Sequence, residues 1–175
     1  MSNLAKLPAF IDKRTFRVAI ESPRGSAVKL KYDPVLQIMS ISRPLPVGLV
    51  FPYDFGFIPA TRGPDDDPVD ALVVWDAASF PGVVMACRAV GVIRVRQNQT
   101  NHDARKRIRN DRILAVPTEA PRTPRGPLAG PGLKRIQEEI SSFLIASTIL
   151  DGKDAAILGW GGADEAIALI RKSLI

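Results

Sequence analysis

The sequence predicts a mainly β protein of the α+β class, in which a small barrel or sandwich is followed by two helices. Short alternating apolar segments fill the first two thirds of the 175-residue chain, Gly and Pro separate them, and helical apolar spacing appears only near the C-terminus. A chain of this length can bury the core of one domain. We therefore expect a single domain over residues 1–175, with residues 1–14 as an N-terminal extension.

The expected strands follow the alternation of apolar and polar residues. In chain order they cover residues 16–20, 28–32, 36–42, 71–75, 83–95 and 112–116. The aromatic residues Phe51, Tyr53, Phe55 and Phe57 would share one face if their segment were extended, because strand side chains alternate between faces.

Both helices are expected late in the chain, after a Pro/Gly-rich loop over residues 118–132. Apolar residues from Leu133 to Leu144 recur at helical spacing. A second helix is expected over residues 163–174, where Asp164 and Glu165 lie near the positive end of the helix dipole.

The composition favours a cytoplasmic protein. Hydrophobic residues make up 46% of the chain, yet no apolar run approaches the length of a membrane span, and the N-terminus lacks the apolar core of a signal peptide. The single cysteine, Cys87, lies inside an apolar segment and is expected to be a core residue. We expect no membrane partner.

The formal net charge of +6 is unevenly distributed. The segment from Arg94 to Arg112 holds seven Arg or Lys residues and two Asp residues, and 7 − 2 gives +5. A nucleic-acid-binding barrel would use such a segment, but single-strand binding also uses stacking aromatic residues, and the sequence has none between these positions. Nucleic acid is therefore the least favoured partner.

The most unusual motif is the run Asp65-Asp66-Asp67-Pro68-Val69-Asp70, with four carboxylates in six residues. Such anions repel one another unless a cation shares the site, and closely spaced aspartates are typical ligands of Mg²⁺. Acidic runs are commonly solvated turns. This run leads directly into the strand expected at 71–75, and that placement favours a metal site.

Three further charged residues, Glu21, Lys29 and Arg43, lie on or next to expected strands. Taken singly, such residues are more often surface charges. Together with the aspartates they would combine carboxylates for metal ions with cations for a multiply charged anion. These are the requirements of phosphoryl transfer to water.

Residues 65–71 resemble the signature of the family I soluble inorganic pyrophosphatases. The resemblance extends over about residues 15–172 and includes segments 21–33, 51–59, 87–91, 115–117 and 159–160. It implies an OB-like five-stranded β-barrel flanked by two C-terminal α-helices, Mg²⁺ as cofactor, hydrolysis of pyrophosphate by a metal-activated water, and a homo-oligomer that is hexameric in bacteria.

The resemblance also implies roles for individual residues. By position, Asp65 and Asp70 match metal ligands, Asp67 matches the residue that orients or deprotonates the attacking water, Lys29 and Arg43 match phosphate-binding residues, and Glu21 matches a supporting carboxylate.

Several positions depart from the family pattern. A family glutamate is replaced by Lys31, a tyrosine by Phe55, a metal-ligand aspartate by Asn110, a phosphate-binding lysine by Arg112, another carboxylate by Arg105, and a phosphate-binding Tyr-Lys pair by Ala146 and Ser147. Arg112 keeps the charge, Asn110 keeps a neutral oxygen for a metal, and Tyr53 would supply the missing hydroxyl.

Three hypotheses stay open. In the first, Lys31 and Arg112 bind the substrate and replace one of the metals, which gives a pyrophosphatase that needs fewer Mg²⁺ ions. In the second, the site binds a phosphorylated ligand with impaired turnover. In the third, the chain is a nucleic-acid-binding OB-like barrel.

Overall fold

The computed structural model describes residues 3–99, 106–119 and 130–175. Its elements in chain order are the 3₁₀ helix η1 (Leu4–Lys6), β1 (Thr15–Ser22), β2 (Val28–Asp33), β3 (Ile38–Pro44), β4 (Asp54–Phe57), β5 (Asp70–Val73), β6 (Val84–Asn98), β7 (Arg107–Arg109), β8 (Arg112–Pro117), α1 (Gly130–Ile149), β9 (Ala156–Gly162) and α2 (Ala163–Lys172).

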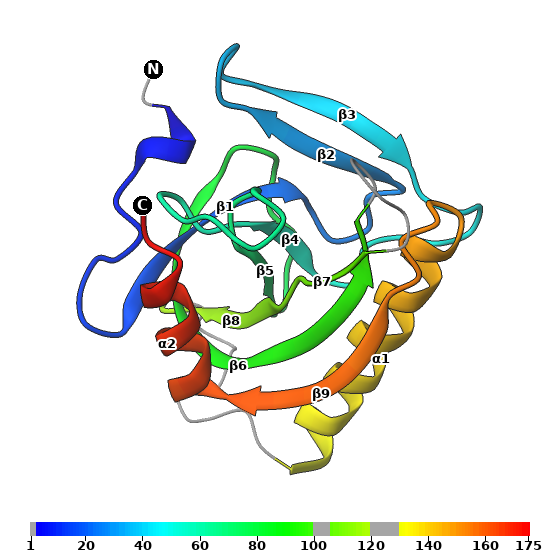
Figure 1. The fold of residues 1–175 in the computed structure, drawn as a ribbon. Helices are drawn as coiled ribbons and strands as arrows, with labels where there is room; N and C mark the ends of the chain where they lie inside the picture. Colours follow the sequence, from blue (N-terminus) through cyan, green and yellow to red (C-terminus); the bar gives the residue numbers. More distant parts are fainter. Residues whose placement is uncertain (1–2, 100–105, 120–129) are drawn as a thin grey trace.

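Five strands close into a barrel. β1 pairs with β4, β4 with β5, β5 with β8, β8 with β6, and β6 pairs back with β1. All of these pairings are antiparallel except that of β5 with β8. The long strand β6 extends beyond the ring, where β7 and β9 add to it (Figure 1). The predicted five-stranded barrel is confirmed.

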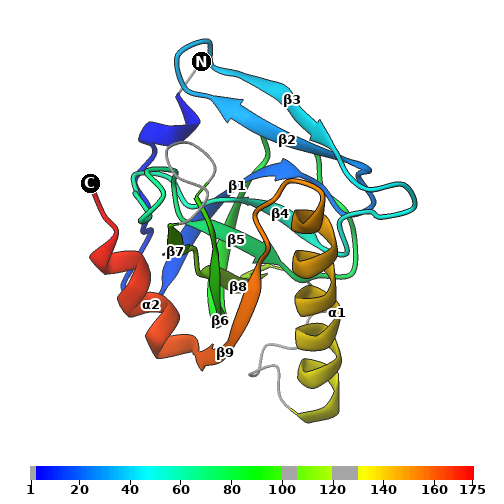
Figure 2. The same ribbon diagram turned by 45° about the vertical axis from the view of Figure 1, so that its right-hand side comes forward.

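The hairpin β2–β3 forms a separate two-stranded sheet above the barrel in both views (Figures 1 and 2). Two side chains at the end of β1 attach it. The hydroxyl of Ser22 accepts a hydrogen bond from the amide of Leu30 at 2.9 Å, and Glu21 accepts one from the amide of Tyr32 at 2.7 Å. This attachment carries the charged residues of β2 and β3 to one end of the barrel.

Alternate residues of the barrel strands face two buried clusters. In β8, Ile113 packs in a cluster with Ile170 of α2, whereas Leu114 packs in a cluster with Phe143 of α1. Figure 2 shows the two helices on different sides of the barrel. A charge at most positions of these central strands would therefore be buried, and the charged groups collect at the strand ends and in the loops.

The structure differs from the sequence expectations in the late elements. The strands β7 and β9 were not expected, and α1 begins at Gly130, within the expected 118–132 loop. Residues 120–129 of that loop lie outside the described residues. Among the residues that the structure describes, no helix has the length and apolar character needed to cross a membrane.

The condition under which the aromatic residues from Phe51 to Phe57 would share one face is not met, because β4 begins only at Asp54. Phe55 packs on Phe51, with ring centroids 5.4 Å apart, whereas Phe57 stacks on Tyr32 with centroids 5.9 Å apart. The chain before Asp54 turns instead of continuing the strand.

Candidate active site

Most of the acidic run lies in a loop of residues 58–69 between β4 and β5, which we call the aspartate loop, and its last residue, Asp70, begins β5. The hydroxyl of Thr61 fixes its base, donating to the carbonyl of Ile58 at 2.6 Å and accepting from the amide of Val69 at 3.0 Å. Within the loop, the amide of Gly63 donates to the carbonyl of Asp67 at 2.7 Å. These bonds hold the loop in one conformation, with its carboxylates at the end of the barrel.

The predicted catalytic residue Asp67 and the predicted metal ligands Asp65 and Asp70 each already contact a nitrogen of the protein. Lys31 Nζ contacts the two carboxylate oxygens of Asp67 at 2.8 and 3.0 Å, Arg112 Nε lies 3.5 Å from Asp70, and the Asn110 amide donates to Asp65 at 2.6 Å. The three donors come from residues that depart from the family pattern. Lys31 and Arg112 therefore place positive charge where a site of carboxylates would attract metal ions.

A pocket of about 200 Å³ contains part of this cluster. Its charged lining residues are Glu21, Lys29, Lys31, Asp66, Asp67 and Asp70. Glu21 is only 6% exposed. Its pKa is raised to about 7, mainly by burial and also by the Asp70 charge, while the hydrogen bond from Tyr32 and the charges of Lys29 and Lys31 act to lower it. A carboxyl in this position binds a proton near neutral pH.

A second, smaller pocket of about 30 Å³ lies beside the first and shares Lys29 with it. Four cationic side chains line it, namely Lys29, Arg43, Arg112 and Lys153. Arg43 is oriented by Asp151, 2.7 Å from its Nε, and by the carbonyl of Ser147 at 2.9 Å. We call this group the cation pocket. Its surplus of positive charge suits a multiply charged anion.

Arg112 is the most enclosed of the four cations, with 6% exposure. Its terminal nitrogens donate to the carbonyl of Asn110 at 2.7 Å and to Gln97 Oε1 at 3.2 Å. Its buried Nε has no hydrogen-bond acceptor among the described residues. Because Arg112 lines the cation pocket and lies against Asp70, it links this pocket to the end of the acidic run.

Sequence reasoning missed Lys153. It lies in the turn between α1 and β9, and burial lowers its pKa, as do the charges of Lys29, Arg112 and Arg43, against an opposing effect of Asp70. A weak signal was present, because Asp151-Gly152-Lys153 places charge in a turn after an apolar helix. That signal carries no information about which distant residues the turn contacts.

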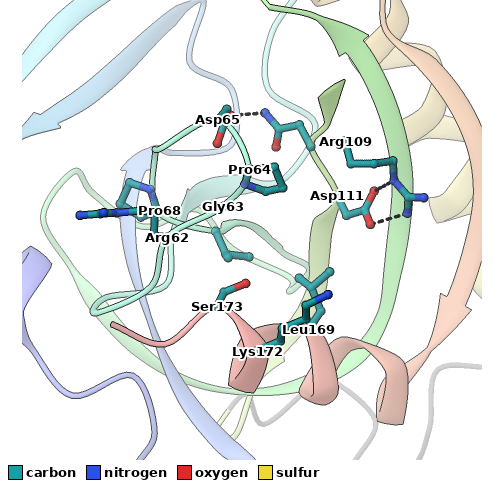
Figure 3. A pocket seen from close by; sticks show the side chains of 12 residues that line it. Arg62, Gly63, Pro64, Asp65, Pro68, Arg109, Asp111, Leu169, Lys172 and Ser173 are labelled. Atoms are coloured by element: carbon teal, nitrogen blue, oxygen red, sulfur yellow. Dashed lines mark hydrogen bonds and ion pairs between the residues drawn. The ribbon is translucent and has the colours of Figure 1, made fainter. Parts of the chain in front are cut away.

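Asp65 and Asn110 lie on the wall of a different pocket, of about 570 Å³, between the aspartate loop and the end of α2 (Figure 3). Burial raises the pKa of Asp65, and the charges of Asp70 and Asp67 raise it further. The three aspartates are therefore close enough to repel one another, although Asp65 does not line the same pocket as the other two.

Other expected or adjacent positions have structural partners. The hydroxyl of Tyr53 donates to Glu139 on α1 at 2.6 Å, so its contact with substrate stays a prediction. The carboxylate of Asp111 accepts from the amide of Val95 at 2.9 Å and pairs with Arg109. Ser147 donates its hydroxyl to the carbonyl of Leu144 at 3.2 Å.

The carboxylates of the candidate site are the groups that could bind a divalent cation. Over residues 3–99, 106–119 and 130–175, no group of three or more His, Cys, Asp or Glu side chains is arranged to hold a metal ion. The mutual repulsion of Asp65, Asp67 and Asp70 nevertheless creates a negative potential that a divalent cation would relieve. Oxygen ligands of this kind suit Mg²⁺. By their chemistry, the oxygens of Asp65, Asp67 and Asp70 suit such an ion.

Comparison with known protein families shows which family has this fold and this loop. The sequence model of the family described as inorganic pyrophosphatase matches residues 18–174. The chain belongs to the inorganic pyrophosphatase family. The match includes all ten sequence-predicted site residues, from Glu21 to Arg112, and also Lys153.

Curated pyrophosphatases and solved pyrophosphatase structures match the whole chain. An inorganic pyrophosphatase from Nostoc sp. is 31% identical over 98% of this chain and 97% of its own length, and one from Synechocystis sp. is 32% identical over 97% and 96%. The crystal structure of inorganic pyrophosphatase from Thermus thermophilus has a TM-score of 0.87 and 30% identity, covering 98% of this chain and 97% of that one. Membership of the pyrophosphatase family supports a metal-dependent enzyme in general.

Proposed function

We propose that this protein hydrolyses inorganic pyrophosphate to two phosphates, with Mg²⁺ as its metal ion. The observation that carries the proposal is the junction of two pockets at Lys29, one with carboxylates and one with cations. Pyrophosphate needs both, because its charge must be bound and a water must be positioned for attack on phosphorus. The family match over residues 18–174 supports the same reaction.

The reaction divides between the two pockets. In the pocket lined by Asp67 and Asp70, Asp67 accepts the proton of the attacking water. Lys31 contacts both carboxylate oxygens of Asp67 and fixes the orientation of that side chain. In the cation pocket, Lys29 and Arg43 bind phosphate oxygens and stabilise the charge that develops on the leaving phosphate. A divalent cation at Asp65 and Asp70 would neutralise substrate charge and lower the pKa of water.

We further propose that this enzyme needs fewer Mg²⁺ ions than a site made of carboxylates alone. Lys31 and Arg112 are already paired with Asp67 and Asp70, and neither cationic side chain can be a metal ligand. Their charges reduce the negative potential that would attract additional divalent ions. Asn110 weakens that attraction further, because a neutral amide replaces a carboxylate.

The two other hypotheses receive less support. Binding of a phosphorylated ligand without turnover would use the same cation pocket, but the intact aspartate loop favours hydrolysis. Nucleic-acid binding loses support because Arg94 pairs with Glu165, Arg107 with Asp154 and Arg109 with Asp111. A cytoplasmic location, which follows from the composition, and a homohexamer, which follows from the family resemblance, remain proposals.

Phosphate release from pyrophosphate tests the proposed function. We expect release that depends on Mg²⁺ in the wild type and falls by about 10²–10⁴-fold in Asp67→Asn, because the amide cannot accept the proton. Asp164→Asn is the matched control, since that carboxylate lies on α2 with its side chain 86% exposed. Folded wild-type protein that releases no phosphate with Mg²⁺, or equal rates in wild type and Asp67→Asn, would contradict the proposal.

A further inference from the structure

The turn between α1 and β9 is fixed to the barrel by its backbone. The amide of Asn98, at the end of β6, donates to the carbonyl of Lys153 at 2.7 Å, and its side chain donates to the carbonyl of Gly152 at 3.0 Å. The hydroxyl of Thr148 accepts from the amide of Ala155 at 3.3 Å. The Lys153 side chain therefore starts from a fixed point beside the cation pocket.

Two of the four cations in this pocket have carboxylate partners and two do not. Arg43 pairs with Asp151, and Arg112 lies against Asp70. In the part of the chain that the structure describes, neither Lys29 nor Lys153 makes an ion pair, although both are partly buried. Like charges brought together out of water destabilise the free protein unless an anion binds between them.

The helix before the turn supplies no cation of its own at this pocket. The backbone carbonyl of Ser147, on α1, accepts a hydrogen bond from Arg43. The short side chain of Ser147 donates its hydroxyl to the carbonyl of Leu144 within the same helix. The long side chain of Lys153 enters the same pocket from the following turn. Among the described residues, the buried Nε of Arg112 has no hydrogen-bond acceptor and only the 3.5 Å ion pair with Asp70.

We infer that Lys153 is a substrate-binding residue whose ammonium group contacts a phosphate of pyrophosphate together with Lys29 and Arg43. The identity of the substrate rests on the proposed function, but the binding role does not require turnover. The ammonium supplies from a turn the positive charge that the α1 position Ser147 lacks. Asp151, two residues earlier, positions Arg43 for the same anion.

Calorimetry with imidodiphosphate, a hydrolysis-resistant analogue of pyrophosphate, tests this inference in the presence of Mg²⁺. Lys153→Met keeps the length of the side chain and removes its charge, so we expect binding about 10-fold weaker or more. Lys153→Arg restores the charge and should recover most of the affinity. Lys134→Met is the control, because Lys134 lies on α1 with its side chain 78% exposed.

The outcomes separate this inference from the proposed function. If wild type hydrolyses pyrophosphate and Lys153→Met binds the analogue as tightly as wild type, the role of Lys153 is wrong and the proposed function stands. If wild type binds without turnover and Lys153→Met loses affinity, the role of Lys153 stands and the proposed function is wrong. No binding by wild type would overturn the inference. Circular dichroism of each variant verifies that it is folded.

Discussion

Glu21 shows how burial changes the chemistry of a single residue in this site. Its carboxyl lies at the end of β1, accepts the amide of Tyr32, and faces Asp70 as well as Lys29 and Lys31. Burial outweighs the two lysines and raises its pKa from 4.5 to about 7. The free protein therefore holds a protonated carboxyl at a pH where the unfolded chain has lost that proton.

This difference predicts how stability depends on pH in metal-free protein. Between about pH 4.5 and pH 7 the folded state binds one more proton than the unfolded state, so stability falls as pH rises through this window. The loss amounts to about 3 kcal/mol at most. In Glu21→Gln the side chain stays neutral, and we expect urea unfolding in EDTA to show a smaller fall between pH 5 and pH 8.

Glu138→Gln is the control for this measurement, because that carboxylate is exposed on α1. It should follow the wild-type dependence of stability on pH. If Glu21→Gln also follows the wild-type curve, Glu21 does not hold its proton in the folded state.

At the scale of elements, local patterns predicted the strands whose residues alternate. β1, β2 and β8 agree with expectation to within two residues at each end. β9 was missed because residues 156–162 contain three glycines and little alternation, and its extended form depends on pairing with β6. β7 is a three-residue strand that likewise exists through its pairing with β6. Such pairing is a tertiary effect that a local pattern does not contain.

In the candidate site too, some residues were predictable from the sequence and others were not. The aspartates were found because they lie together in one loop and resemble a known signature. The partners of these aspartates were not predictable, because Lys31, Arg112 and Asn110 reach them from β2, β8 and the preceding turn. Lys153 was missed for the same reason. Its distance from Lys29 along the chain gives no sign that both line one pocket.

The pairing of β1 with β4 depends on Gly56, which lies opposite Ile20. A Cβ at this position would overlap the carbonyl of Ala19. Gly56→Ala would therefore separate the two strands that lead to Glu21 and to the aspartate loop. We expect a loss of about 1–3 kcal/mol or more in the free energy of unfolding, measured with urea.

Gly132→Ala is the matched control, because a Cβ at Gly132 meets open space in the first turn of α1. It should leave stability unchanged or raise it by up to about 1 kcal/mol, since alanine favours helix. Equal stability of Gly56→Ala and wild type would show that β1 and β4 do not approach as closely as described.

At the scale of the whole molecule, some of the positive charge is paired with acidic side chains and some of it lines the cation pocket. Arginines of β6 and β7 pair with neighbouring acids, as Arg94 does with Glu165 and Arg107 with Asp154. In the cation pocket, Lys29 and Lys153 have no paired carboxylate within the described part of the chain. The charge of this protein therefore favours a small polyanion at one site over a long nucleic acid along a surface.

The same distribution of charge underlies the proposal that this enzyme needs fewer Mg²⁺ ions. A barrel that places Lys31 on Asp67 and Arg112 on Asp70 supplies from its own chain part of the charge that divalent cations would bring. Lys31→Glu reverses one of these charges and restores the carboxylate that the family resemblance places there. The variant should therefore require more Mg²⁺ ions for activity.

The most direct test is the rate of phosphate release from pyrophosphate against free Mg²⁺, for wild type and Lys31→Glu. We predict that the curve for Lys31→Glu rises more steeply, with a higher apparent order in Mg²⁺, because another cation must bind before the site is neutralised. Curves of the same order for both proteins, with both active, would contradict the claim that Lys31 replaces a metal ion.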